Sequence, residues 1–211
     1  MTVTERLPLS RERIVVEALA LIDDDGLDRL SMRRLGARLG VEAMSLYNHV
    51  QNKNDLLDAV VDHMLAQVEV PAPDVGDWRE RLQALAANFR ALGLAHPEAF
   101  VLLVDRPKRS LRSWEPLLES YRIFRALGLS EQAAADAYHA AAGFVVGSVL
   151  SEIAFLRRSA DGTRGIGPDD VPAELVELRE FVAADRCGRD EERFRIGVDL
   201  FISGIETTLP G

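Results

Sequence analysis

The sequence predicts an all-α protein. Apolar residues recur at steps of three and four along nearly the whole chain, the spacing that places them on one face of a helix. No segment shows the sustained alternation that is typical of a half-buried strand. Proline and glycine stand where the helical spacing is interrupted, as expected at helix ends. These three observations together predict a helical fold without a sheet.

Two helices are predicted at the N-terminal end. The first begins after Ser10, a residue type that caps helix N-termini, and its apolar periodicity stops before Gly26. Ser31 caps a second, short helix over residues 32–39. Gly40 ends that helix, because glycine enters the left-handed region of backbone conformation without strain.

Two further helices precede the first long break. A third short helix is predicted over residues 42–50, and Asn52 caps a fourth helix with an apolar face. Pro71 and Pro73 follow, and neither can continue a helix. We therefore predict a boundary near residues 68–76.

The helical pattern resumes after this boundary. Helices are predicted over residues 78–95, 98–104, 115–127, 131–158, 172–184 and 191–208. Residues 159–171, rich in glycine, aspartate and arginine, are predicted to be a loop. A chain of 211 residues is long enough for one ordinary domain or for a small module joined to a larger one.

Charge is unevenly distributed along the chain. The formal net charge of −9 argues against a protein that coats nucleic acid or an anionic membrane without selectivity. Residues 29–53 are nevertheless cationic. Their basic residues are Arg29, Arg33, Arg34, Arg38 and Lys53, and their one acid is Glu42. This segment is where we expect contact with nucleic acid.

Composition excludes several classes of protein. The longest apolar stretch, 140–150, is too short to cross a bilayer, and acidic and basic residues interrupt residues 1–30, so we expect neither a membrane span nor a secretory signal. The single cysteine, Cys187, excludes an intrachain disulfide and is expected to be inert. Hydrolase, metalloprotease, P-loop and dinucleotide motifs are absent from the sequence. We expect a cytoplasmic protein that is not an enzyme and has no catalytic residues.

The cationic segment has the parts of a helix-turn-helix. It contains two short helices joined by a tight turn, and Gly36 and Ala37 are small where those helices would cross. Its inward face comprises Leu35, Leu39, Val41, Leu46 and Val50. A second helix over 42–50 is of a size to lie in a major groove roughly 12 Å wide, with its N-terminal residues on base edges.

The segment LSMRRLGARLGVEAMSLYNHVQNKNDLLDAV, from Leu30 to Val60, resembles the DNA-binding domain of TetR-family transcriptional regulators. The elements LGV, LYxHV and NKxxLL carry the resemblance, and HPEAF, DRP, GLSEQAA and GFVVGSVLSE extend it to the tetracycline repressor subgroup. The resemblance implies an all-α homodimer. Residues 1–52 would form the helix-turn-helix DNA-binding domain, the helix 53–68 a linker, and residues 69–211 the ligand-binding and dimerisation domain.

The resemblance also implies that side chains of the helix-turn-helix contact double-stranded DNA at a near-palindromic operator. Base-facing positions are Arg33, Ala43, Met44, Ser45 and Asn48. Backbone-facing positions are Ser31, Met32, Tyr47, His49 and Lys53. Ala43, Met44 and Asn48 depart from the subgroup, so we expect a different operator. Arg6, Arg11 and Arg13 are further candidates for contacts to the adjacent minor groove or phosphates.

A small organic effector is the second expected partner. The expected ligand-binding residues are Leu85, Phe89, His96, Leu103, Arg106, Trp114, Ser120, Tyr138, Ala142 and Val146. Mostly apolar walls with few polar groups suit drug-sized organic molecules. An aromatic stripe at helical spacing is also what a packed core looks like, so that alternative stays open.

No metal or cofactor is expected. The histidine and glutamate with which the tetracycline repressor subgroup binds a metal fall at Leu103 (Leu102 in another alignment) and at Ser151. Leucine offers no oxygen ligand to a hard cation. A site shifted to Glu152 is the alternative, but one helical residue turns a side chain by about 100°.

Small residues gather in the helix predicted over 131–158, which suits a close helix contact in a dimer. Together with these small residues, an apolar stripe on the helix predicted over 191–208 is expected to form a four-helix dimer interface. The stripe comprises Phe194, Val198, Phe201, Ile202 and Ile205. In a monomer the same stripe would be core. We therefore predict a homodimeric, ligand-responsive DNA-binding regulator, most simply a repressor. The alternative is a helical dimeric interaction or ligand-binding module without DNA binding.

Overall fold

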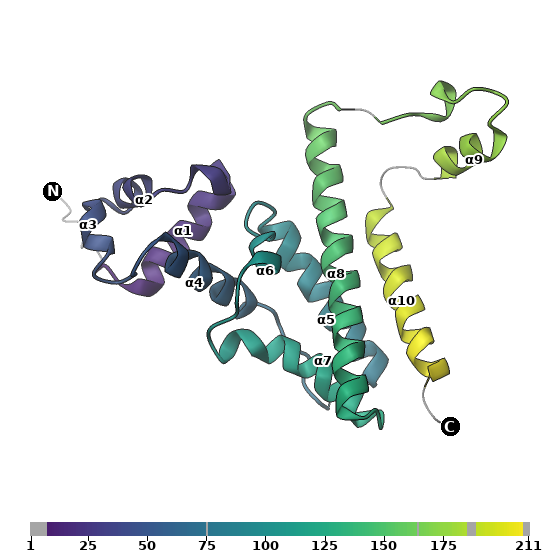
Figure 1. The fold of residues 1–211 in the computed structure, drawn as a ribbon, viewed down its shortest axis with the longest axis horizontal. Helices are drawn as coiled ribbons and strands as arrows, with labels where there is room; N and C mark the ends of the chain where they lie inside the picture. The colour runs from purple at the N-terminus through teal and green to yellow at the C-terminus, as the bar shows by residue number, and fades with distance from the viewer. Residues whose placement is uncertain (1–7, 75, 164, 185–188, 209–211) are drawn as a thin grey trace.

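The computed structural model describes residues 8–74, 76–163, 165–184 and 189–208, so Arg6 and Cys187 lie outside the described residues. Within these ranges every regular element is a helix, which confirms the all-α prediction. A small N-terminal unit, α1 to α4, lies at one end of the molecule (Figure 1). The long helices α8 and α10 lie beside each other at the opposite end, and α9 projects from them (Figure 1).

The N-terminal unit begins where the capping residues predict. Its helices are α1 (Arg11–Asp25), η1 (Leu27–Arg29), α2 (Met32–Leu39), α3 (Ala43–Leu46) and α4 (Lys53–Leu65). The side chains of Ser10, Ser31 and Asn52 each accept a backbone N–H from the first turn of the helix that follows. Gly40 ends α2 in the left-handed region, at φ 70°. Local capping chemistry therefore determines these boundaries.

The crossing of α2 and α3 depends on one glycine. A Cβ at Gly36 would lie 2.9 Å from the carbonyl oxygen of Val41 and 3.2 Å from the Cα of Ala43. Ala37, expected at the same crossing, is instead exposed on the outer side of α2. The buried side chains Leu35, Leu39, Leu46 and Val50 hold the two helices to the core of the unit, whereas Val41 is half-buried.

The third helix is shorter than predicted. Only Ala43–Leu46 is α-helical, and a turn covers residues 47–49. The N–H of Tyr47 bonds to the oxygen of Met44 (3.2 Å) and that of His49 to the oxygen of Leu46 (2.9 Å), so the chain tightens to three-residue steps. The predicted helix 42–50 is therefore a one-turn helix with a tight extension.

The C-terminal unit contains α5 (Trp78–Ala95), α6 (Leu102–Asp105), η2 (Arg112–Trp114), α7 (Glu115–Ala126), α8 (Glu131–Ala160), η3 (Pro168–Asp170), α9 (Val176–Ala184) and α10 (Asp190–Thr208). Helices α5, α7 and α8 pack against one another. Two predictions were too long at their N-termini: the helix predicted over 98–104 begins only at Leu102, and that over 172–184 begins at Val176.

The stripe on α10 is core of this chain. Phe194, Val198, Ile202 and Ile205 are buried against α5 and α8. Gly197 allows this contact, because a Cβ there would clash with the ring of Phe144. The expectation that this stripe forms a dimer interface is therefore wrong, because the same face already covers the chain's own helices.

Helix α8 is long and apolar enough to span a membrane by length and composition alone, although the apolar stretch 140–150 within it is too short to do so. It packs instead against α5, α7 and α10 of the C-terminal unit. Only 11% of its most apolar window is buried inside the chain. Gly143 and Gly147 lie on its open side, where a Cβ would meet no atom within 4 Å. The helix thus presents a smooth, uncovered surface.

Candidate nucleic-acid interface and effector cavity

The outer surface of α3 and the following turn carries the predicted reading residues. Met44 is 74% exposed and Tyr47 43% exposed, and Asn48 is exposed beside them. Ala43, Ser45 and His49 are half-buried on the flanks of the same surface. This arrangement follows from Leu46 and Val50, whose burial turns the intervening residues outward.

The basic residues of α2 divide into paired and unpaired groups. Arg34 forms an ion pair with Asp25 (2.5 Å), and Arg38 pairs with Asp24 (2.6 Å) and with Glu17 on α1. Arg29 and Arg33 are exposed and have no ion pair with any described residue. Carboxylates of α1 thus neutralise one side of the basic segment, and the available positive charge is at the start of α2.

Lys53 joins two parts of the N-terminal unit. Its Nζ donates to the carbonyl oxygen of Leu30 at 2.7 Å, although the residue as a whole is exposed. This bond ties the first residue of α4 to the start of α2, next to Ser31 and Met32, which are half-buried. An ammonium group has three N–H donors, so Lys53 keeps donors for another acceptor.

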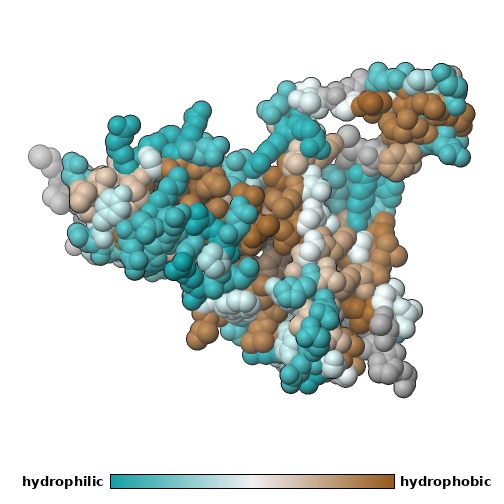
Figure 2. All heavy atoms as spheres, in the orientation of Figure 1, coloured by the Kyte–Doolittle hydropathy of each residue, from teal (hydrophilic) through white to brown (hydrophobic). Residues whose placement is uncertain are grey.

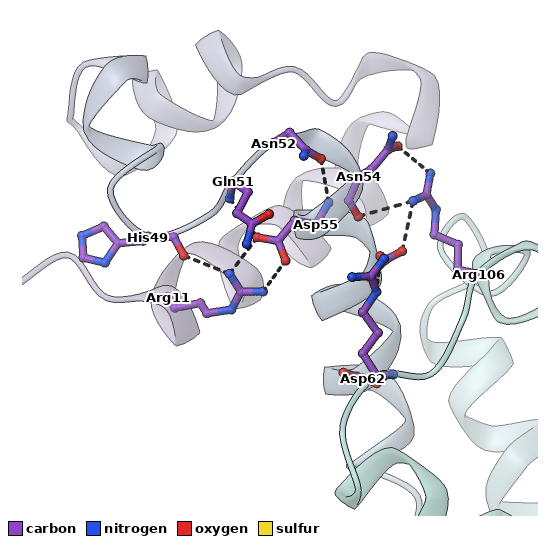
Figure 3. A network of polar contacts seen from close by, with 10 residues as sticks. Arg11, His49, Gln51, Asn52, Asn54, Asp55, Asp62 and Arg106 are labelled. Atoms are coloured by element: carbon purple, nitrogen blue, oxygen red, sulfur yellow. Dashed lines mark hydrogen bonds and ion pairs between the residues drawn. The ribbon is translucent and has the colours of Figure 1, made fainter.

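Arg11 has a structural partner instead of a free surface. Its guanidinium donates to both carboxylate oxygens of Asp55 (2.9 and 2.8 Å) and to the carbonyl oxygen of His49 (2.9 Å), as Figure 3 shows. The hydrogen bond from Arg11 lowers the pKa of Asp55 to about 2, with help from the backbone N–H of Gln51. The proposed DNA contact of Arg11 is therefore replaced by a bond that anchors the reading turn to α1.

Helix α4 is also clamped to the C-terminal unit. The carboxylate of Asp58, 3% exposed, accepts hydrogen bonds or ion pairs from Arg106 (3.1 Å) and Arg109 (2.8 Å). Arg106 also donates to the backbone and side-chain oxygens of Asn54, and the backbone N–H of Arg109 donates to Asp62 (Figure 3). The expected ligand contact of Arg106 is therefore wrong, because its guanidinium binds α4 instead.

His96 and Trp114 are likewise not in the ligand cavity. The Nδ1 of His96, at the end of α5, lies 2.8 Å from a carboxylate oxygen of Asp23 on α1. Trp114 lies in η2 and is 48% exposed. Both expectations arose from residue type alone, and neither side chain lines the cavity described below.

A cavity of about 400 Å³ opens among α5, α7 and α8. Of the predicted ligand residues, it is lined by Leu85, Phe89, Leu103, Ser120, Tyr138, Ala142 and Val146. Further lining residues are Leu65, Leu82, Ala86, Val104, Lys108, Leu117, His139, Ala141, Gly143 and Val145. Figure 2 shows the apolar atoms that gather beside α8. The cavity is mostly apolar, as expected of a site for an organic molecule.

Few polar groups line the cavity. Burial raises the pKa of the Tyr138 phenol, so its hydroxyl stays a donor at neutral pH. Ser120 donates to carbonyl oxygens of its own helix, at 3.3 Å for Leu117 and 3.5 Å for Pro116. Lys108, which sequence reasoning missed, lies in a segment without helical periodicity and gave no pattern signal.

The lining does not fit a metal ion. Leu103 and Gly143 occupy the wall, and Glu152 is held by two bonds to Arg90 (2.6 and 2.8 Å) away from the lining residues. In the part of the chain that the structure describes, no group of three His, Cys, Asp or Glu side chains could hold a metal. Glu152, the residue of the alternative shifted site, is thus bonded to Arg90 and does not line the cavity.

Comparison with known proteins covers both units. The family described as bacterial regulatory proteins, tetR family, matches residues 14–60, and the tetracyclin repressor-like C-terminal domain matches residues 70–209. An HTH-type transcriptional regulator of Saccharopolyspora erythraea is 36% identical over 206 residues, which cover 95% of this chain and 86% of that protein. The tetracycline repressor protein class D of Escherichia coli is 31% identical over 205 residues, with coverage of 95% and 91%.

A solved structure shares the fold. The TetR family protein ActR of Streptomyces coelicolor, in complex with actinorhodin, superimposes with a TM-score of 0.81 at 30% identity. The match covers 97% of this chain and 100% of that chain. The agreement therefore extends over both units and is not limited to the helix-turn-helix.

Proposed function

The chain belongs to the TetR family of bacterial regulatory proteins, and from this premise we propose that it is a homodimeric repressor released from a near-palindromic operator by a small organic effector. It is a DNA-binding transcriptional regulator, and its relatives are regulators and not enzymes. Regulators of this family bind DNA and small-molecule effectors, usually as dimers. We place the protein in the cytoplasm, with residues 1–52 as the DNA-binding domain, 53–68 as the linker and 69–211 as the effector domain.

We assign base contacts and phosphate contacts to different side chains. Base contacts are proposed for Arg33, Ala43, Met44, Ser45 and Asn48, and phosphate contacts for Ser31, Met32, Tyr47, His49 and Lys53. The exposure of Met44, Tyr47 and Asn48 and the unpaired charge of Arg33 support this division. Phosphate contacts position the protein, whereas base contacts specify the sequence.

The proposed dimer uses the uncovered side of α8 together with α10. Gly143 and Gly147 give a close approach without obstruction, and Leu200, 68% exposed, lies on the outer side of α10. Two copies joined there would form a four-helix contact. A two-fold pair reads half-sites about 34 Å apart, which a single helix-turn-helix cannot do.

Release by an effector is carried by one observation: α4 bonds to the start of α2 at one end and lines the cavity at the other. Its first residue, Lys53, bonds to Leu30, and its last, Leu65, lines the cavity. The segment from Leu103 to Arg109 also connects the cavity to α4. Leu103 lines the cavity, and Arg109 forms an ion pair with Asp58 on α4. An effector that fills the cavity would thereby bias the position of α4, and tenfold weaker DNA binding requires about 1.4 kcal/mol of coupling.

The test begins with selection of bound fragments from a random duplex pool, followed by titration of the recovered site at several salt concentrations. We expect a palindrome and a linear dependence of log affinity on log salt. Recovery of no site by a folded, dimeric protein would contradict the DNA-binding proposal.

Two sets of variants then test the assignment of contacts. Arg33→Ala should relax the preference at one base pair, a loss of about 1–3 kcal/mol of discrimination. Tyr47→Phe combined with Lys53→Ala should weaken all sequences alike and lower the salt slope by about 1. If both sets lose preference at the same base pair, the division into base and phosphate contacts is wrong.

A further inference from the structure

One cation stands in the wall of the apolar cavity. Lys108 is half-buried and lines the cavity, and no described Asp or Glu residue is among the lining residues. Within the described ranges, no ion pair or hydrogen bond involves its ammonium group. A charged amine that is partly withdrawn from water loses hydration, and an anion bound beside it would offset that loss.

The neighbouring basic residues are already paired, unlike Lys108. Arg106 and Arg109 both bind the buried carboxylate of Asp58, at 3.1 and 2.8 Å. These two guanidinium groups thus bind helix α4. Lys108, between them in sequence, is the member of the three that lines the cavity.

Two other polar groups of the lining, those of Tyr138 and His139, can also donate to an acceptor on a ligand. The Tyr138 hydroxyl stays protonated, and His139, whose ring lies 5.0 Å from that of Tyr138, can donate a ring N–H. Ser120 donates to its own helix. The cavity thus presents donors and one ammonium group against apolar walls, and its lining contains no carboxylate.

We propose that the effector is an amphipathic organic acid whose apolar body fills the cavity and whose anionic group binds Lys108. This inference rests on the proposed function of the cavity as the effector site and narrows the class of molecule that it accepts. A neutral molecule of the same shape would bind more weakly, because it leaves the ammonium group without a counter-charge.

Two fluorescent probes with the same ring skeleton test the charge. 1-Anilinonaphthalene-8-sulfonate is anionic, and N-phenyl-1-naphthylamine lacks the sulfonate. We expect the wild type to bind the anionic probe about tenfold more tightly at low salt, as a charge-assisted hydrogen bond predicts. Lys108→Met should remove this preference and leave the affinity for the neutral probe unchanged. Lys108→Arg should retain the preference.

Two controls locate the effect. Arg29→Met removes an exposed cation from η1 that has no ion pair with any described residue, and it should not change the affinity for either probe. Ala142→Trp fills the cavity from α8 and should abolish binding of both probes. Retained binding of the neutral probe by Lys108→Met also shows that the cavity is intact in that variant.

The outcomes separate this inference from the function on which it rests. Equal affinities of the wild type for the two probes, or an unchanged preference in Lys108→Met, would overturn the charge inference alone. Absence of binding of either probe, or binding that survives Ala142→Trp, would overturn the cavity as the effector site and the inference with it. DNA binding is measured separately and does not depend on either result.

Discussion

Asp55 performs two structural tasks at the start of α4. Its carboxylate pairs with Arg11 and accepts the backbone N–H of Gln51, so it fixes the turn between α3 and α4 to α1. Because the phosphate contact that we propose for His49 lies in this turn, the pair positions the reading surface without touching DNA. The sequence motif NKxxLL identifies Asn52 and Lys53. It gives no sign that Asp55, between Lys53 and the two leucines, forms an ion pair with Arg11, 44 residues away.

This pair predicts a pH-dependent contribution to stability. The pKa of Asp55 is lowered to about 2 in the folded chain, against about 3.9 in an unfolded one, so its stabilisation is present above pH 4 and is lost as the pH falls toward 2. Because the Arg11 side chain is 47% exposed, screening limits the pair to about 1 kcal/mol.

Asp55→Asn should therefore lower the free energy of unfolding by about 1 kcal/mol at pH 7 and by clearly less at pH 3, measured by urea unfolding. Asp28→Asn is the control, since Asp28 is exposed and has no ion pair among the described residues. A loss of equal size at pH 3 and pH 7 would show that the charge of Asp55 does not stabilise the fold.

Among the elements, helix boundaries were predictable wherever a capping side chain decides them. The side chains of Ser10, Ser31 and Asn52 each bond to the first turn of the helix that follows. The start of each helix can therefore be predicted from residues adjacent in the sequence. The short α3 was not predictable from periodicity, because its tight extension still places Leu46 and Val50 inward. Contacts between distant elements left no local signal at all, which is why His96 and Arg106 were assigned to the wrong site.

The clamp between α4 and the C-terminal unit gives an element-scale prediction. Asp58→Asn removes the charge that two guanidinium groups share, and it should destabilise the protein by about 2 kcal/mol. Asp62→Asn is a matched control on the same helix, because its partner is the backbone N–H of Arg109 and an amide oxygen can replace the carboxylate there. We expect it to cost less than about 1 kcal/mol in the same urea unfolding measurement.

Hydrogen exchange of α4 extends this comparison to dynamics. If the clamp holds the helix, Asp58→Asn should speed exchange of the amides near Asn54 and Asp58, and exchange in α1 should change less. Equal effects of the two substitutions on stability and exchange would mean that the buried ion pairs do not hold α4 to the C-terminal unit.

At the scale of the whole molecule, two of the apolar surfaces that the described residues leave uncovered lie on the C-terminal helices. One is the open side of α8 and α10. The other is α9, where Figure 2 shows apolar atoms on the projecting segment and where Val176 and Phe181 are 57% and 67% exposed. Large exposed apolar surfaces mark interaction sites. Both lie in the C-terminal unit, whereas the N-terminal unit is covered largely by hydrophilic residues (Figure 2).

The proposed dimer therefore predicts that one charge on the smooth side of α8 separates the two copies. Gly147→Arg introduces a long cation where an added Cβ would meet no atom of another part of the chain within 4 Å, so the fold should tolerate it while the contact between copies should not. Gly165→Arg is the control, because it adds the same side chain at an equally open glycine outside the helices. Sedimentation should give a dimer for the wild type and the control, and a monomer for Gly147→Arg.

The monomer should also bind the operator more than tenfold more weakly, because each copy would reach only one half-site. A folded Gly147→Arg protein that remains dimeric would move the interface away from α8, with α9 as the next surface to test.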